Sequence, residues 1–355
     1  MHGRTSVGSR FFILTTCVLP SAACSGPAIH AFGLSGNSAD NTSVEPDGAA
    51  AGGADADATG ASPDADTLQP ATDGGAPPTN DEVGDNFTGS KRIMRGPAPT
   101  VASASSKGPY TVKTTTSGYK DEPNFSAATI YYPTDADPPF AAVAICPGFT
   151  ATQSSVSAWG PFLASHGIVV MTIDTNTTAD SVVQRSSALM DALDSLKAEN
   201  SRADSPLMGK LDTARMGLMG WSMGGGGTWI DANAHPELKT AITLAGHISS
   251  APGGSGAITS IAVPTLMFAG QTDSPVLGGG MSQPIYSQIP ESVPKMLYEI
   301  AGLGHDAGNN PANNSKNVGL YGLSWQKVFL EGDRRYRDFL LTKGPNASDF
   351  RTNLK

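Results

Sequence analysis

The residues with the clearest chemical potential form a Gly-x-Ser-x-Gly pattern at 220–224, centred on Ser222. The pattern follows an apolar run at 216–219 and precedes a plausible helix start at 225–230. A sharp strand-to-helix turn of this kind forces the serine into a strained conformation and presents its hydroxyl above the sheet. The alternative, a glycine-rich turn without chemistry, is less compatible with strand, motif and helix in this order. The pattern therefore indicates Ser222 as a nucleophile.

A serine hydroxyl is a weak nucleophile until a neighbouring imidazole removes its proton, and a carboxylate usually orients that imidazole. Where the serine lies on such a turn, the acid and then the base follow it along the chain. Asp273 lies in a polar loop directly after an expected strand at 265–269, and His305 follows an expected strand at 296–300. The sequence thus predicts Ser222, Asp273 and His305 as catalytic residues.

Two neighbours compete for these roles. His247 follows an expected strand at 241–244 and could face the site, but it precedes Asp273, which breaks the usual order. Asp306 is a rival acid, but adjacent residues rarely face each other well enough for the carboxylate to reach Nδ1 of His305. We expect His305 to be the base and Asp306 to be a surface acid.

Acyl transfer also requires donors for the oxyanion, normally the amide that follows the nucleophile and one from a loop after an earlier strand. Here these are the amides of Met223 and of Phe149 in the loop at 146–150. The Phe149 ring could also line the acyl site, or it could be only a partly buried loop aromatic. His, Cys and carboxylates show no metal-ligand spacing, and a dinucleotide motif is missing, so we expect neither metal nor cofactor.

The elements that position these residues alternate between strands and helices, which is typical of an α/β fold with a parallel sheet. Apolar runs of five or six residues suit strands buried on both faces, whereas longer periodic segments suit helices. The expected strands are 128–132, 141–145, 168–173, 216–219, 241–244, 265–269 and 296–300, and the expected helices are 155–166, 181–196, 284–289 and 318–329. We therefore predict an α/β-hydrolase domain over 91–355, with a central, mostly parallel, twisted sheet flanked by helices.

The first 90 residues have a different character. Residues 1–23 have basic residues, a short apolar run and small residues, which is the layout of a secretory signal peptide. Cys24 follows at the position of a lipidated cysteine and is a candidate lipid anchor. Residues 24–90 are rich in Gly, Ala, Asp, Ser, Thr and Pro, so we expect a disordered acidic segment. It is either a flexible tether or a solvated tail without a specific role.

The charge of the chain excludes one class of partner. The formal net charge is −9 over 355 residues. Nucleic-acid binding needs clustered Lys and Arg, and the sequence has no such run. An uncharged or weakly charged substrate fits better, and we expect a secreted monomer.

At these residues the chain resembles the bacterial cutinase and polyethylene terephthalate hydrolase family. The similarity extends from 95–97 to 349–352. Its most specific stretches are Pro147-Gly148-Phe149-Thr150, Gln153-Ser154-Ser155, Ala164-Ser165-His166-Gly167, Thr172-Ile173-Asp174-Thr175-Asn176, Gly220-Trp221-Ser222-Met223-Gly224-Gly225-Gly226-Gly227 and Arg335-Tyr336.

The resemblance implies an α/β hydrolase with an open, lidless cleft that cleaves cutin, short-chain acyl esters and synthetic polyesters. Ser222, Asp273 and His305 fall on the family's triad, while Met223 and Phe149 fall on its oxyanion-hole residues, the latter usually Tyr. The sequence departs from the family in two places that bear on the substrate. His247 stands where a substrate-binding Trp is usual, and Asp273 is followed by an atypical loop that ends in three glycines, 278–280.

Three functions follow from these observations. The preferred one is an exported serine esterase that acts on polyesters, with polyethylene terephthalate as a candidate, and on short acyl esters through an acyl-enzyme. The second is a small-molecule carboxylesterase or triacylglycerol lipase. The third is a catalytically inactive lipoprotein that binds surfaces, against which the complete Ser, Asp, His set counts.

Overall fold

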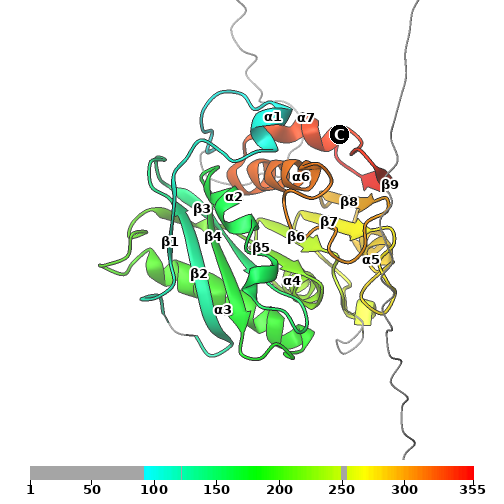
Figure 1. Ribbon diagram of the computed structural model, residues 1–355, viewed down its shortest axis with the longest axis horizontal. Helices are drawn as coiled ribbons and strands as arrows, with labels where there is room; N and C mark the ends of the chain where they lie inside the picture. The colour runs from blue at the N-terminus through cyan, green and yellow to red at the C-terminus, as the bar shows by residue number, and fades with distance from the viewer. Residues whose placement is uncertain (1–91, 121, 249–253) are drawn as a thin grey trace, which may run out of the picture. The chain divides into compact units, whose positions relative to one another are not determined.

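The structure is a computed structural model that describes residues 92–355, apart from 121 and 249–253 (Figure 1). The signal peptide expected at 1–23 and the tether expected at 24–90 lie outside the described residues. In the part of the chain that is described, no helix combines the length and the apolar character that crossing a bilayer requires.

A nine-stranded sheet in the order β1-β2-β4-β3-β5-β6-β7-β8-β9 forms the centre of the described domain. Strands β4, β3, β5, β6, β7 and β8 pair in parallel, whereas β1, β2 and β9 pair antiparallel at the two edges. This confirms the mostly parallel sheet. The strands are β1 (Val112–Thr115), β2 (Phe125–Pro133), β3 (Phe140–Cys146), β4 (Val169–Thr175), β5 (Leu211–Trp221), β6 (Thr240–Leu244), β7 (Thr265–Gly270), β8 (Lys295–Ile300) and β9 (Ala347–Thr352).

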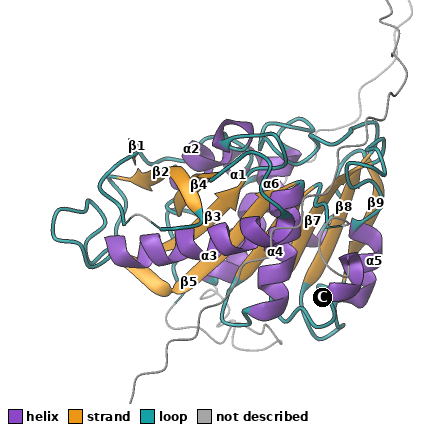
Figure 2. Ribbon diagram, turned by 90° about the horizontal axis from the view of Figure 1, so that it is seen from below, coloured by secondary structure: helices purple, strands orange, loops and turns teal. Residues whose placement is uncertain are grey.

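Helices cover both faces of this sheet, and α3, α4 and α5 lie together on one of them (Figure 2). Helices α1, α2, α6 and α7 contribute to the core on the opposite face. The α-helices are α1 (Val101–Ala104), α2 (Trp159–Ala164), α3 (Val182–Glu199), α4 (Met223–Ala234), α5 (Ser282–Gln288), α6 (Asn317–Gln326) and α7 (Arg337–Leu341). Short 3₁₀ turns occupy Gln153–Ser155, Gly254–Ala257 and Arg334–Tyr336, and a π-helical turn, Lys327–Glu331, continues α6.

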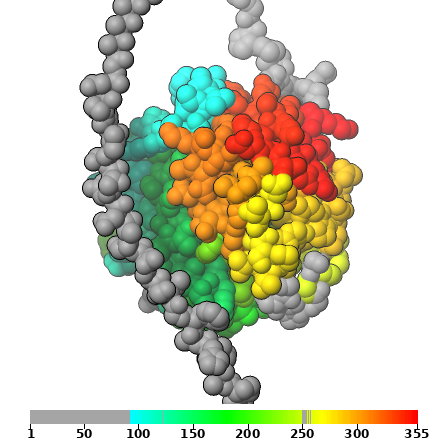
Figure 3. Space-filling model, turned by 45° about the vertical axis from the view of Figure 1, so that its right-hand side comes forward, coloured from blue at the N-terminus to red at the C-terminus, as the bar shows by residue number. Residues whose placement is uncertain are grey.

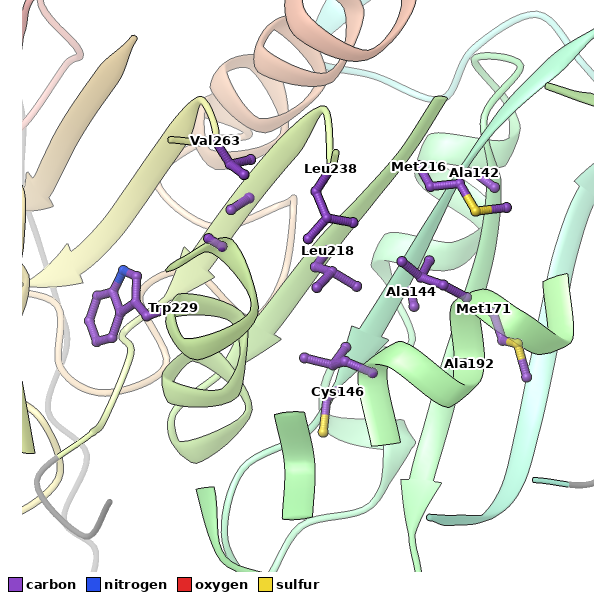
Figure 4. Packing of buried hydrophobic residues seen from close by; sticks show 14 of the residues in the cluster. Ala142, Ala144, Cys146, Met171, Ala192, Met216, Leu218, Trp229, Leu238 and Val263 are labelled. Atoms are coloured by element: carbon purple, nitrogen blue, oxygen red, sulfur yellow. The ribbon is translucent and has the colours of Figure 1, made fainter. Parts of the chain in front are cut away.

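The core consists of two layers because successive side chains of a strand point to opposite faces. In β3, Ala142, Ala144 and Cys146 belong to the layer beneath α3 and α4, while Ala141 and Val143 belong to the other layer. Figure 4 shows the first layer, where the β3 side chains meet those of neighbouring strands and helices. All seven residues of β3 are buried, which explains its uninterrupted apolar sequence.

One expected helix is shorter than the sequence indicated. Instead of a helix over 155–166, the chain forms the 3₁₀ turn Gln153–Ser155 and then α2 over Trp159–Ala164. The loop and 3₁₀ turn before α2 bring Gln153 to Asp174, where the Gln153 backbone N–H donates to the carboxylate at 2.6 Å. A tertiary contact therefore delays the start of the helix.

The two ends of the described chain meet on one surface. Helix α1 packs against α6, and Figure 3 shows the cyan N-terminal segment beside the orange and red C-terminal segments. Strand β9 completes this end of the fold by pairing with β8. The loops that follow the carboxyl ends of the parallel strands carry the candidate site.

Candidate active site

Ser222 occupies the tight turn between β5 and α4, with φ 54° and ψ −121°. A Cβ atom on Gly220 would lie 2.1 Å from the carbonyl oxygen of Gly224, and one on Gly224 would lie 2.3 Å from that of Cys146. Both glycines of the motif are therefore required by close backbone approach. This steric requirement explains the Gly-x-Ser-x-Gly spacing.

The strained backbone of Ser222 is held from both sides. Its N–H donates to the Leu244 carbonyl at 3.0 Å, and its carbonyl accepts from Gly226 N–H at 3.0 Å and from His247 N–H at 2.8 Å. A positive φ outside glycine persists only where the surroundings impose it. These three hydrogen bonds connect the turn to β6, to α4 and to the loop after β6.

Asp273 and His305 come from the loops after β7 and β8, which are adjacent parallel strands. Nδ1 of His305 lies 2.9 Å from Oδ2 of Asp273. The two side chains are 14% and 3% exposed, so the hydrogen bond is shielded from water. A carboxylate at Nδ1 holds the proton there and leaves Nε2 free to act as a base.

Trp221 connects His305 to the serine turn. Its indole N–H donates to the His305 carbonyl at 2.9 Å, and its ring centre lies 5.2 Å from that of the imidazole. Because Trp221 directly precedes Ser222, this contact holds the His305 imidazole next to the turn that carries the hydroxyl. The sequence reasoning did not single out Trp221, although an indole N–H in such a motif requires an acceptor and could have indicated one.

The two expected oxyanion donors lie at neighbouring elements. Met223 is the first residue of α4, and the first N–H groups of a helix have no partner within the helix. On the other side, Gly148 packs so closely that a Cβ atom there would lie 2.7 Å from Cβ of Ser222. Phe149 follows directly, and its side chain is 51% exposed. The arrangement can present two amides to a carbonyl oxygen bound at Ser222.

His247 lies beside the Asp273–His305 pair but is not part of it. Burial lowers the pKa of its imidazole, the backbone carbonyl of Leu277 raises it, and the nearby His305 lowers it further. Oδ2 of Asp273 accepts a hydrogen bond from Nδ1 of His305, which favours His305 over His247 as the base. The carboxylate of Asp306 instead accepts from Asn309, at 3.0 Å, on the exposed side of the loop.

The loop after Asp273 lies against His247. Val276 and Leu277 expose 80% and 48% of their surface there. Three amides, those of Leu277, Gly278 and Gly279, converge on the carbonyl of Ser274 at 2.9 to 3.1 Å. A Cβ on Gly279 would lie 2.2 Å from the Asp273 carbonyl, so this glycine allows close packing. These contacts hold the loop together despite its glycines.

Within the described residues, no group of three or more His, Cys, Asp or Glu side chains is arranged to hold a metal ion. Cys146 is a free, fully buried thiol, and burial raises its pKa to about 12. Around Ser222, the described residues offer a hydroxyl, an imidazole, a carboxylate and backbone amides.

The mostly parallel sheet and the strained serine between β5 and α4 define an α/β hydrolase. Comparison with known proteins gives the family. Residues 88–353 match the protein-family model described as "PETase: PET hydrolase-like", and the chain belongs to this family. Over 250 residues it is 39% identical to the bis(hydroxyethyl) terephthalate hydrolase of Streptomyces coelicolor, covering 69% of this chain and 76% of the relative. It is also 39% identical over 250 residues to cutinase 2 of Thermobifida cellulosilytica, covering 69% and 90%. The protein is accordingly a carboxylic ester hydrolase.

Proposed function

We propose that the protein cleaves polyesters and short acyl esters through an acyl-enzyme on Ser222. The observation that carries this proposal is the shielded Asp273–His305 hydrogen bond beside a strained serine turn. The names of the relatives, a terephthalate ester hydrolase and cutinases, support the substrate class. Exposed Phe149, Val276 and Leu277 would provide apolar contacts for a polymer segment.

In the proposed reaction, Ser222 Oγ attacks the ester carbonyl while His305 Nε2 takes the hydroxyl proton. Asp273 stabilises the imidazolium that forms, and the amides of Phe149 and Met223 donate to the developing oxyanion. His305 then gives the proton to the leaving alkoxide, which departs as an alcohol. Water attacks the acyl-enzyme with His305 as base, and the carboxylic acid leaves as Ser222 regains its proton.

We extend the proposal to the cellular context. Residues 1–23 would direct export, residues 24–90 would form a tether and residues 91–355 the catalytic domain. Cys24 would be the site of lipid attachment, and the enzyme would act as a monomer at the outer cell envelope. Mass spectrometry of the mature N-terminus would test the anchor, because diacylglycerol on Cys24 adds a defined mass and an unmodified cysteine would contradict it.

The test of function compares wild type with Ser222→Ala on p-nitrophenyl butyrate, an aliphatic polyester and an aromatic polyester. We expect the substitution to lower kcat at least about 10⁴-fold on every substrate, because it removes the group that forms the acyl-enzyme. Ser187→Ala, at a partly exposed position of α3, is the matched control and should retain full activity. Turnover retained by Ser222→Ala would contradict the mechanism, and wild-type activity confined to p-nitrophenyl butyrate would favour the small-molecule esterase.

A further inference from the structure

A buried arginine lies beneath the loop that carries Phe149. Arg185 is near the start of α3, and its side chain is fully buried. A buried guanidinium is costly to desolvate, so the fold must satisfy it with well-placed acceptors. Neither the proposed reaction nor the core packing described above uses this charge.

The guanidinium donates to oxygens at the end of β3 and in the segment from Thr175 to Asp180. Nη1 donates to the Pro147 carbonyl at 3.0 Å and to Thr175 Oγ1 at 3.3 Å. Nη2 donates to the Thr178 carbonyl at 2.9 Å, and Nε donates to the Asp180 carbonyl at 3.1 Å. The planar fork thus joins the end of β3 to the segment between β4 and α3.

These bonds fix both sides of Phe149. Pro147 lies two residues before it and bonds directly to Arg185. Thr150 follows it and donates its N–H to the same Thr178 carbonyl at 2.8 Å. Thr150 also has a φ of 59°, a strained value that requires support from its surroundings. Arg185 therefore supports the loop from Pro147 to Thr150 directly on one side and through Thr178 on the other.

The Pro147 carbonyl, which accepts from Arg185, also lies near Met223, the second proposed oxyanion donor. A Cβ on Gly224 would lie 2.5 Å from the Pro147 carbonyl, so this carbonyl packs against the first turn of α4. Met223, at the start of α4, directly follows Ser222. The acceptor of Arg185 thus lies between the loop that carries Phe149 and the helix that begins at Met223.

We propose that Arg185 is a positioning residue that sets the Phe149 N–H for the oxyanion by holding the loop from Pro147 to Thr150. This inference rests on the proposed function, since it assigns a role within the same reaction. Lysine cannot replace the arginine, because an ammonium lacks the planar fork that reaches separate acceptors in fixed directions. A donor that acts only on the developing charge affects kcat more than substrate binding.

The experiment compares Arg185→Met and Arg185→Lys with wild type on p-nitrophenyl butyrate, with active sites counted by a fluorophosphonate label. We expect kcat per labelled site to fall roughly ten- to a hundredfold in both variants, with KM changed less than about threefold. Complete removal of an oxyanion donor costs about 10² to 10³ in kcat, and a displaced donor should cost less. We also expect the preference for an ester over its thionoester to shrink, because that preference depends on the oxyanion donors.

Arg215→Met is the matched control. Arg215 is also buried, with a side chain 4% exposed, and it donates to the Glu331 carbonyl at 3.0 Å and to Asp212. We expect this variant to lose stability but to retain kcat per labelled site and the ester preference. Thr175→Val, which removes one acceptor of Arg185 while keeping its shape, should give a smaller change in the same direction if the arginine variants do not fold.

The inference is wrong if kcat per labelled site and the thionoester ratio are unchanged in the arginine variants, or in Thr175→Val where those do not fold. It is equally wrong if Arg215→Met changes both quantities as much as Arg185→Met. Failure of the proposed function would look different: wild type would then carry no label on Ser222, whatever the state of Arg185.

Discussion

At the scale of single residues, the proposed reaction depends on one carboxylate. Asp273 is 3% exposed, and its Oδ2 accepts from Nδ1 of His305 at 2.9 Å. An amide in its place would fill the same volume, but it could not stabilise the imidazolium and would favour the other tautomer. The residue is therefore important for charge rather than for packing.

We expect Asp273→Asn to lower kcat about 10³- to 10⁴-fold with little change in the folded structure. Asp306→Asn is the control, because that carboxylate is exposed and bonds to Asn309. Steady-state kinetics on p-nitrophenyl butyrate would measure both variants. Equal losses in the two variants, or no loss in Asp273→Asn, would mean that the acid is assigned wrongly.

The sequence alone indicated these residues because chain order restricts which acid and base can follow the serine. It did not indicate Trp221 or Arg185 as partners of the site. Their roles depend on hydrogen bonds to carbonyls, of His305 and of Pro147, that are distant in the sequence. The sequence shows that an indole or a guanidinium needs acceptors, but only the fold shows which carbonyls these are.

At the scale of elements, the site depends on how closely the loop after β3 approaches the start of α4. Cys146 and Gly220 are partners in the parallel pairing of β3 with β5, which places the two strand ends side by side. Gly148 then lies against both Ser222 and the Trp221 ring. The loop can approach this closely only without a side chain.

We expect Gly148→Ala to lower kcat roughly 10²-fold, because its Cβ would lie 2.7 Å from that of Ser222 and would displace the nucleophile or the loop. Gly256→Ala, where a Cβ would meet nothing within 4 Å, should leave the kinetics unchanged. A crystal structure of the Gly148→Ala variant would locate the displacement. An unchanged kcat in that variant would show that the loop accommodates the added methyl group without loss of activity.

The sequence predicted the buried strands better than the edge strands. The buried parallel strands have apolar runs, and strands β3 and β7 begin and end within about one residue of expectation. Strands β1 and β9 were not predicted, since both are short edge strands with partly exposed, polar residues. Their strand character comes from antiparallel pairing with β2 and β8, and an edge strand shows little periodicity of its own.

At the scale of the whole molecule, a buried histidine makes stability depend on pH. The pKa of His166 is lowered from 6.5 to about 4, chiefly by burial and also by the nearby charge of Lys327, while the hydrogen bond to the Ser106 carbonyl opposes the shift. The imidazole also packs edge to face on Phe162. His166 contacts Ser106 in the segment before β1 and Phe162 in α2. Protonation of the buried imidazole should therefore destabilise the packing of both segments.

Between pH 6.5 and about 4 the unfolded chain binds a proton at His166 that the folded protein does not bind. The free energy of unfolding should therefore fall as the pH is lowered through this range, by about 3 kcal/mol from this group. Urea unfolding at several pH values would measure the slope. His166→Gln should be less stable at neutral pH but should have a smaller slope, and an unchanged slope would exclude His166 as its source.

The most direct test of the central claim is the identity of the residue that forms the covalent intermediate. Wild type and Ser222→Ala are treated with a fluorophosphonate, and the labelled peptides are identified by mass spectrometry. We predict one adduct per wild-type molecule, on Ser222, together with loss of esterase activity, and no adduct on the variant. Labelling of a different residue, or full activity in a protein whose Ser222 is labelled, would contradict the account.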